Sequence, residues 1–228
     1  MLVIFDMEGT TIEDKGRVPT ALMQGLQANG FAVTDAEVRA VRGASKREAI
    51  RLLIEQRLER PGQDSTALAE QTYTAFRDRL QKTYQAERVR FIDGTLSTFA
   101  WLRNKGIKIV LNTGFDRMIT DTIVENLAWQ NQDVAAMICG DDVKSGRPAP
   151  YLIFHAMERT SIMNVRQGMN VGDTVRDLQA GFHAGVKFNV AVLSGAHSAE
   201  QLSEEPHTHL LSSVAELPTL LQGELPLS

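Results

Sequence analysis

Blocks of apolar and polar positions along this chain predict two kinds of structural element. Runs that are apolar throughout recur at 2–5, 107–111, 135–139, 168–172 and 188–193, with a weaker one at 209–211. Such runs are typical of strands buried on both faces of a parallel sheet. Between them, segments such as 94–106 and 117–129 have helical apolar spacing, and Gly106 fits the end of the first. Strand alternating with helix predicts an α/β fold with a doubly wound, Rossmann-like parallel sheet.

Residues 15–90 interrupt this alternation, because their apolar positions keep a helical spacing and no strand-like run divides them. An all-helical block between the first strand and the remaining strands is typical of an inserted cap. We therefore expect a core domain formed by residues 1–14 and 91–228, and a helical cap domain formed by residues 15–90.

Composition and charge narrow the range of partners. The 228 residues are 43% apolar and 23% charged, which is ordinary for a globular protein, and the net charge is −4. This charge gives no reason to expect nucleic acid or an anionic membrane as a partner. Cys139 is the single cysteine, so no internal disulfide can form. With no apolar stretch approaching the roughly 20 residues of a membrane helix, and no basic leader, we expect a cytoplasmic protein.

Polar side chains with chemical potential follow the apolar runs. Asp6 comes directly after run 2–5, Thr113 lies just beyond run 107–111, and Asp173 comes directly after run 168–172. Arg147 stands in the loop GRPAP that follows run 135–139. Open α/β sheets bind ligands beyond the carboxyl ends of their strands, so we expect these residues to converge at one edge.

Each of these residues also has a simpler explanation. Asp6 could be a turn acid, Thr113 a helix N-cap, and Arg147 a solvated loop charge. Asp177 has capping-box spacing to Thr174, which explains Asp177 but leaves Asp173 unexplained. For the chain to have no functional site here, every one of these separate explanations would have to be true. A single shared site accounts for all of the residues at once and is therefore favoured.

Carboxylates from separate strand ends repel one another unless a cation joins them. A few carboxylates, with water and a substrate phosphate, are the usual ligands of Mg²⁺. An aspartate can attack phosphorus to form an aspartyl-phosphate, while threonine and arginine hold the other phosphoryl oxygens. The residues therefore predict Mg²⁺-dependent chemistry on the phosphoryl group of a substrate.

The segments DMEGT, GRPAP and GDTVRD, with the strand-end Thr113 between the first two, resemble the four motifs of the haloacid-dehalogenase-like (HAD) hydrolase superfamily. The motifs occur in the family's order, and the resemblance covers essentially the whole chain. It implies a hydrolase with a capped Rossmann-like core, in which Asp6 is the nucleophile. It further implies that Mg²⁺ is held by Asp6, Asp173 and the main-chain carbonyl of Glu8.

The same resemblance assigns the phosphoryl-binding residues. Thr113, Gly114 and Arg147 would bind the phosphoryl group, and Asp177 would orient Arg147 or a metal-bound water. The family more often has lysine in place of Arg147, so the charge is kept while its reach and geometry change.

Two positions indicate the phosphonatase-like branch, the relatives of phosphonoacetaldehyde hydrolase. The segment RGASKREAI (42–50) resembles the cap segment in which a lysine forms a Schiff base, and Lys46 occupies that place. Ser45 and Glu48 have capping-box spacing, which makes Lys46 the first helical residue, where the helix dipole lowers the pKa of an amine. At position 8, most phosphatases of the family have Asp as general acid and phosphonatases have Ala, whereas this chain has Glu8.

These two positions support different reactions. Glu8 as proton donor favours hydrolysis of a small phosphate ester, with Lys46 steering the substrate, and this is our first hypothesis. Cleavage of a C–P bond with Lys46 as Schiff-base lysine is the alternative, and Lys46 could also be a solvated surface residue. A metal-free dehalogenase and a non-catalytic binding protein with the same fold are further alternatives. Whether two copies form a homodimer is left open.

Overall fold

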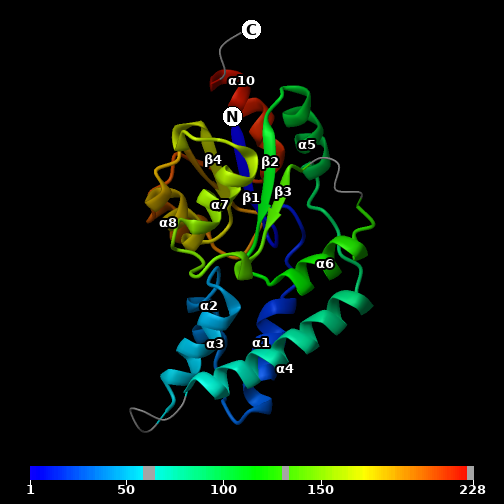
Figure 1. The fold of residues 1–228 in the computed structure, drawn as a ribbon, viewed down its shortest axis with the longest axis vertical. Coiled ribbons are helices and arrows are strands. Elements are labelled where there is room, and N and C mark those ends of the chain that lie inside the picture. Colours follow the sequence, from blue (N-terminus) through cyan, green and yellow to red (C-terminus); the bar gives the residue numbers. More distant parts are fainter. Residues whose placement is uncertain (59–64, 130–133, 225–228) are drawn as a thin grey trace.

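The computed structural model describes residues 1–58, 65–129 and 134–224, and it contains a six-stranded sheet with helices on both faces (Figure 1). The strands are β1 (Leu2–Asp6), β2 (Lys108–Asn112), β3 (Ala136–Ile138), β4 (Gly168–Gly172), β5 (Phe188–Val192) and β6 (His209–Leu211). Their order is β3-β2-β1-β4-β5-β6, and every pairing is parallel. The predicted doubly wound parallel sheet is therefore confirmed.

Strand β1 shows why the central strands are apolar throughout. Val3 and Phe5 point to one face and join an apolar cluster with α5 and α10, where the Phe5 ring lies 5.3 Å from the ring of Phe99. Leu2 and Ile4 point to the other face and pack on α7 and α8. The helices on these faces are α5 (Thr95–Asn104), α7 (Tyr151–Thr160), α8 (Val175–Ala184) and α10 (Leu217–Glu224). Both faces are covered, so neither requires polar positions.

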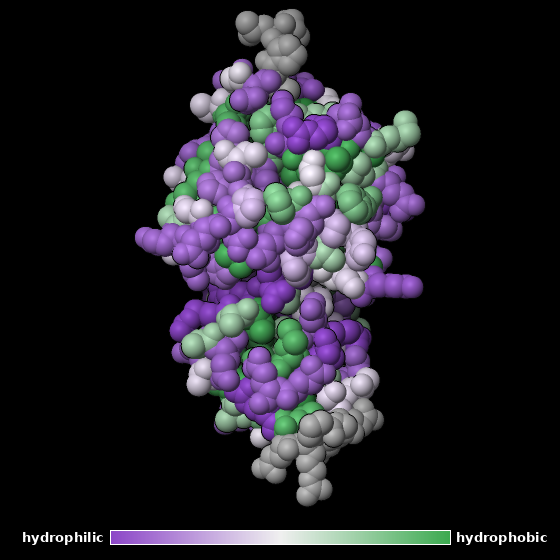
Figure 2. Space-filling view, turned by 90° about the vertical axis from the view of Figure 1, so that its left-hand side faces the viewer, coloured by the Kyte–Doolittle hydropathy of each residue, from purple (hydrophilic) through white to green (hydrophobic). Residues whose placement is uncertain are grey.

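Four helices lie together beyond the carboxyl ends of the strands (Figure 1). They are α1 (Arg17–Ala28), α2 (Asp35–Ala40), α3 (Lys46–Glu55) and α4 (Ser65–Ala86). Helix α4 packs along α1 and α3, and also against α6 (Arg117–Asn126). Helix α6 belongs to the main body, which is the sheet together with the helices outside the segment 15–90. All four helices fall within the segment 15–90, and we call them the insert helices. Figure 2 shows hydrophilic residues gathered at the junction between the insert helices and the larger part of the molecule.

The two chain segments that connect the insert helices to the sheet are joined by Arg17. Its guanidinium donates hydrogen bonds to the carboxylate of Glu87 at 2.9 Å and to the carbonyl of Arg88 at 3.2 Å. A longer bond, 3.4 Å, reaches the carbonyl of Glu13. One buried side chain therefore ties the outgoing segment to the returning one.

The remaining described elements are short. They are α9 (Ala199–Ser203) and three 3₁₀ turns at Gly140–Asp142, Val165–Gln167 and Val214–Glu216. In the described part of the chain, no helix has the length and apolar character needed to cross a membrane.

Candidate active site

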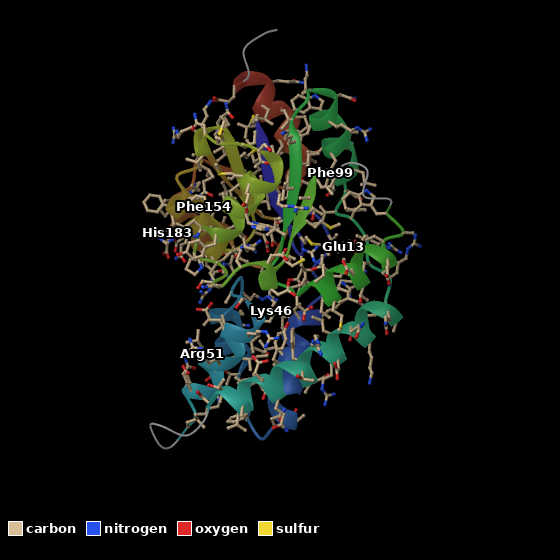
Figure 3. All side chains as sticks on the ribbon, viewed as in Figure 1. Glu13, Lys46, Arg51, Phe99, Phe154 and His183 are labelled. Carbon is tan, nitrogen blue, oxygen red and sulfur yellow. The ribbon has the colours of Figure 1, made fainter. Side chains whose placement is uncertain are left out.

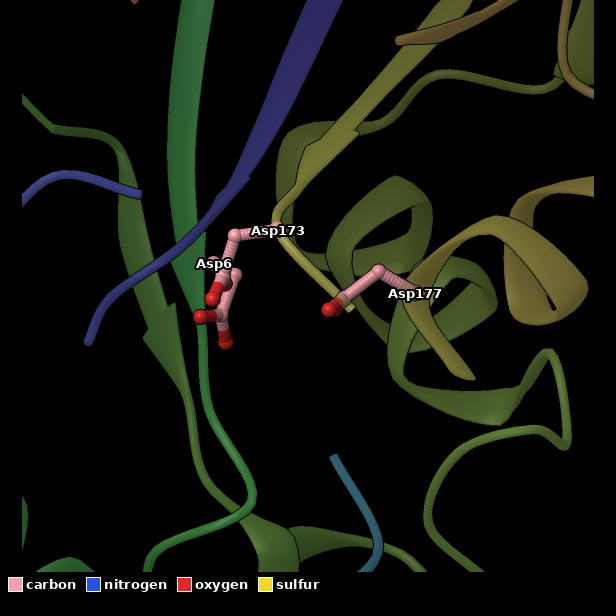
Figure 4. Close-up of side chains that lie close together, drawn as sticks. All are labelled: Asp6, Asp173 and Asp177. Carbon is pink, nitrogen blue, oxygen red and sulfur yellow. The ribbon is translucent and has the colours of Figure 1, made fainter. Parts of the chain in front are cut away.

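The sheet brings its acidic residues together where the strand order reverses, between β1 and β4. Asp6 is the last residue of β1, Asp173 directly follows β4, and Asp177 lies in the first turn of α8. All three are buried, and one carboxylate oxygen from each lies within 4.8 Å of the others (Figure 4). The predicted convergence of Asp6 and Asp173 is thus observed, since parallel strands end at the same edge.

Arg147 is the cation that faces two of these acids. Its Nη1 lies 2.7 Å from Asp6 Oδ1 and 2.8 Å from Asp177 Oδ1. Its Nη2 donates to the main-chain carbonyl of Asn112 at 3.2 Å and to the Asn112 side chain. The guanidinium is almost fully buried, so Arg147 is not a solvated loop charge. Its position beside Asp177 agrees with the expected orienting contact.

Asp173 is held by neutral groups. Thr10 Oγ1 donates to its Oδ1 at 3.0 Å, and the N–H of Ala196 donates to its Oδ2 at 2.7 Å. Gly9 and Gly195 pass so close that a Cβ atom on either would collide with this carboxylate. The glycine after Glu8 therefore has a local reason, because it lets the chain turn against Asp173 with a φ of 89°.

The three carboxylates have more negative charge than Arg147 balances. Burial raises the pKa of Asp6, the charge of Arg147 lowers it and the charge of Asp177 raises it, and together these effects leave the pKa at about 6. Burial, with the charges of Asp6 and Asp177, holds the pKa of Asp173 well above its usual range. A bound divalent cation would offset this repulsion, so the residues present fit a metal site.

These side chains open on a cavity of about 60 Å³ between the sheet edge and the insert helices. Among the residues that line it are Asp6, Glu8, Lys46, Thr113, Gly114, Arg147 and Asp173. Every predicted site residue except Asp177 therefore faces one space, and Asp177 reaches it through Arg147. The volume holds a handful of water-sized groups, which favours a compact substrate.

Glu8 lies in this cavity with one oxygen already engaged. Tyr84 of α4 donates its hydroxyl to Glu8 Oε1 at 2.7 Å. Burial and the charge of Asp14 raise the pKa of Glu8, the hydrogen bond from Tyr84 and the charge of Lys46 lower it, and together these effects leave the pKa at about 7. The carboxyl group therefore exchanges a proton in the neutral range, as a general acid and base does.

Lys46 enters the cavity from the insert side, and Figure 3 places it between the insert helices and the strand ends. Helix α3 begins at this residue, and the Ser45 hydroxyl accepts the N–H of Glu48 at 3.3 Å, which is one half of the predicted capping box. The Nζ lies 5.3 Å from the centre of the Phe115 ring. Burial lowers the pKa of the amine, against the charges of Glu8 and Asp6. Lys46 is therefore not the solvated surface residue of the simpler explanation.

The N-cap explanation of Thr113 is wrong. Helix α6 begins at Arg117, and its cap is Asp116, whose side chain accepts the N–H of Ile119 at 3.0 Å. Thr113 stays on the cavity, where its hydroxyl accepts the N–H of Phe115 at 3.1 Å. The hydroxyl proton remains available to a ligand, because this contact uses only an oxygen lone pair. For Thr174 and Asp177, by contrast, the predicted capping box is formed.

Sequence reasoning missed three residues of the site. Thr10, which holds Asp173, stands inside the motif that drew attention to Asp6. Asn112, which holds Arg147, is the last residue of β2 and could have been suspected from that position. Tyr84 lies 76 residues from Glu8 within an ordinary helical pattern, so no local signal marks it.

Comparison with known proteins agrees with this geometry. A family model described as haloacid dehalogenase-like hydrolase matches residues 3–191. The chain belongs to this family. It is 32% identical over 219 residues to a phosphonoacetaldehyde hydrolase of Hahella chejuensis, covering 92% of this chain and 74% of that protein. A phosphonoacetaldehyde hydrolase of Bacillus cereus is 29% identical and covers 89% of this chain and 79% of its own length.

Solved structures show the same fold for this haloacid dehalogenase-like hydrolase. A phosphonoacetaldehyde hydrolase-like protein from Oleispira antarctica superposes with a TM-score of 0.85 at 23% identity, covering 97% of this chain and 91% of the other. A putative β-phosphoglucomutase from Bacteroides vulgatus gives 0.81 at 19% identity, covering 99% and 90%. The family match and the relatives at 32% and 29% identity show that the chain is a hydrolase and a relative of the phosphonatase-like branch, which decides against a non-catalytic binding protein.

Proposed function

We propose that this hydrolase uses Mg²⁺ to cleave a small phosphate ester through an aspartyl-phosphate on Asp6. The observation that carries the proposal is the joint placement of Asp6 and Glu8 on one small cavity that Arg147 and Thr113 also line. A nucleophile, a proton donor and two groups that hold phosphoryl oxygens are the parts that ester hydrolysis requires.

Asp6, Asp173 and the main-chain carbonyl of Glu8 would hold the metal. When bound, Mg²⁺ neutralises the charge of the phosphoryl group and of the carboxylates around it. Arg147 and the hydroxyl and backbone of Thr113 and Gly114 would bind the remaining phosphoryl oxygens. Asp177 keeps the Arg147 guanidinium directed at the cavity.

In the first step, an Asp6 oxygen attacks phosphorus, and the bond from phosphorus to the ester oxygen breaks. Glu8 gives its proton to that leaving oxygen, so an alcohol departs rather than an alkoxide. In the second step, Glu8 takes a proton from a water molecule that attacks the aspartyl-phosphate. Phosphate leaves, and both Asp6 and Glu8 return to their starting states.

We also propose that residues 15–90 act as a cap, because the insert helices lie over the strand ends and contribute Lys46 to the cavity. Within this arrangement Lys46 steers the anionic substrate. Its ammonium group and the start of α3 present positive charge to the same space.

Phosphate release from a panel of small phosphate esters, measured with Mg²⁺ and with a chelator, tests this proposal. We expect turnover with Mg²⁺, loss of turnover in chelator, and recovery when Mg²⁺ is restored. Full phosphate release in chelator would overturn the dependence on Mg²⁺, and no turnover of any ester would overturn ester hydrolysis.

Cleavage of a C–P bond is a second candidate, favoured by the half-buried position and lowered pKa of Lys46 in the cavity of Asp6. The relatives at 32% and 29% identity are named for that reaction. In this case the amine condenses with an aldehyde carbonyl and releases water, which gives an iminium. Asp6 then attacks phosphorus, and the electron pair of the C–P bond moves into an enamine. Protonation of the enamine carbon and hydrolysis of the imine release the aldehyde and restore Lys46. Attack of water on the aspartyl-phosphate releases phosphate and restores Asp6.

Borohydride trapping with an aldehyde phosphonate separates the two candidates. A reduced adduct on Lys46, together with loss of C–P cleavage in Lys46→Arg, would establish the second reaction. Absence of an adduct, with ester hydrolysis falling by on the order of 10²-fold or more in Glu8→Ala, would establish the first.

A further inference from the structure

Tyr84 forms a hydrogen bond with the side chain of Glu8. It lies in the last turn of α4, has no solvent-exposed surface, and donates its hydroxyl to Glu8 Oε1 at 2.7 Å. With one oxygen engaged in this way, the other oxygen of Glu8 is the one left for a proton and for a substrate.

Tyr84 is itself held in place by contacts on three sides. Asn126 of α6 donates its side-chain amide to the Tyr84 carbonyl at 2.6 Å. The guanidinium of Arg17 lies 5.5 Å from the ring centre, and the Phe115 ring packs edge-on at 6.1 Å. Because Asn126 belongs to the main body, this end of α4 is anchored to the sheet side of the molecule.

We propose that Tyr84 is a positioning residue that directs Glu8 at the leaving oxygen of a phosphate ester. The inference rests on the proposed function, in which Glu8 is the proton donor. Glutamate has one more rotatable bond than aspartate, so it requires an external anchor to hold a single orientation. The hydrogen bond from Tyr84 supplies that anchor, and it comes from a residue that touches neither the metal ligand Asp173 nor the phosphoryl-binding residues through any described hydrogen bond.

Two substrates of similar size isolate this role. Ethyl phosphate requires a proton on its leaving oxygen, whereas acetyl phosphate releases acetate without one. The measured quantity is the ratio of kcat/KM for ethyl phosphate to that for acetyl phosphate, with Mg²⁺ present. We expect Tyr84→Phe, which keeps the ring, to lower this ratio roughly tenfold, the worth of one hydrogen bond. Turnover of acetyl phosphate shows that the variant still folds and still forms the site.

A matched control lies on the same helix. Tyr73 donates its hydroxyl to Asp116 at 2.5 Å, but it does not line the cavity of Asp6. Tyr73→Phe removes a tyrosine–carboxylate hydrogen bond from α4 and should leave the ratio at the wild-type value. In a Glu8→Gln background the ratio is already lowered, and Tyr84→Phe should lower it no further, because both changes act through one group.

The outcomes distinguish this inference from the proposed function. If Glu8→Gln lowers the ratio but Tyr84→Phe does not, the positioning role is overturned while ester hydrolysis stands. An equal fall in Tyr73→Phe, or an additive fall in the double variant, also overturns it. A wild-type protein that leaves ethyl phosphate unreacted overturns the proposed function, and this inference with it.

Discussion

Asp6 is a buried carboxylate that shares the guanidinium of Arg147 with Asp177. Burial destabilises the charged form of Asp6 more than the contact with Arg147 stabilises it, and the pKa of Asp6 therefore rises from 3.8 to about 6. A raised carboxyl pKa favours folding while the group is protonated. The contribution is fully present below about pH 4 and is lost as the pH rises through 6. In the metal-free protein, the charge that function needs thus lowers stability at neutral pH.

Replacing Asp6 by Asn should abolish turnover and also stabilise the metal-free protein at neutral pH. Activity should fall by several orders of magnitude, since the proposed nucleophile is removed. In chelator at pH 7.5 the free energy of unfolding should rise by on the order of 3 kcal/mol, because a buried charge is replaced by a neutral amide. Denaturant titration at pH 7.5 and pH 5 measures this, and the difference should shrink at pH 5. Near wild-type phosphate release would contradict the role of Asp6 as nucleophile. A difference in unfolding free energy between variant and wild type that is the same at pH 7.5 and pH 5 would contradict its raised pKa.

The acidic cluster as a whole should bind Mg²⁺ in a pH-dependent manner. Protons compete with the metal for Asp6, so the affinity for Mg²⁺ should increase as the pH is raised from 5.5 to 7.5. Added Mg²⁺ should raise the melting temperature of the wild type, and Asp173→Asn should reduce this shift strongly. Asp121→Asn, on the exposed side of α6, is the control and should behave as the wild type. A pH-independent shift, or one that survives Asp173→Asn, would place the metal elsewhere.

The loop that leads from α2 to α3 meets the main body at glycines. Gly43 has a φ of 80°, and a Cβ atom there would lie 2.5 Å from Thr174 Oγ1. Gly114 and Gly146 come close to the same loop from the other side, where a Cβ atom would lie 3.1 Å from Ala44 and Ser45 respectively. The loop before Lys46 is thus packed closely on the main body, with a collision for any side chain at Gly43 and tight contacts at Gly114 and Gly146.

Gly43→Ala should therefore impair activity more than it impairs folding. Gly30 is the matched control, because it lies in the same segment with a φ of 84°, but a Cβ atom there would meet no other atom within 4 Å. Both substitutions strain the backbone by on the order of 1 kcal/mol, so both should lower stability by a similar amount. Only Gly43→Ala should lower kcat/KM for the ester substrate, by roughly tenfold or more, because it holds the loop away from Thr174. Equal activity in the two variants would contradict this role of the loop.

At the scale of the whole molecule, the insert helices are connected to the sheet by two segments that Arg17 ties together. The last turn of α4 is also anchored to α6, because the Asn126 side chain donates a hydrogen bond to the carbonyl of Tyr84. Helices α2 and α3 lie farther from these connections. The loop between them contacts the main body beside the cavity. Motion of the insert is therefore expected to open and close the cavity at the loop, with the connecting segments near 14–20 and 88–93 as hinges.

Binding of a phosphate mimic should protect the loop at residues 40–50 from hydrogen exchange. Tungstate with Mg²⁺ would occupy the phosphoryl site and draw positive groups of the loop towards it, so exchange there should slow. Exchange mass spectrometry with and without tungstate makes the comparison, and strand β5, which lies away from the cavity, is the internal reference. Unchanged protection of residues 40–50 would count against closure.

The sequence by itself determined the fold class and most of the site. Apolar runs without a polar side require burial on both faces, and this requirement leads to a parallel sheet whose strand ends meet. Asp6, Thr113 and Asp173 could be placed at those ends from the order of residues alone, because each lies next to its run in the chain. Lys46 could be placed at the start of a helix for an equally local reason, the spacing of Ser45 and Glu48.

Tertiary structure decided which of these groups touch. The hydrogen bond from Tyr84 to Glu8 joins residues 76 positions apart in the sequence, and the one from Thr10 to Asp173 joins residues 163 positions apart. Arg147 forms ion pairs with acids from two separate elements. No local pattern encodes such contacts, because they depend on how helices pack against the sheet. Thr113 is a further example, because its spacing to Asp116 fits a helix N-cap, whereas in the structure the N-cap of α6 is Asp116.

Burial also decided the pKa values of Asp6, Glu8 and Lys46, and burial is a property of the folded chain. Sequence could name these three residues as candidates, since each lies in a recognisable local pattern. It gave the direction of the pKa shift for Lys46, through the helix dipole, but not for Asp6 or Glu8, because the loss of water around a charge arises only when the insert covers the strand ends.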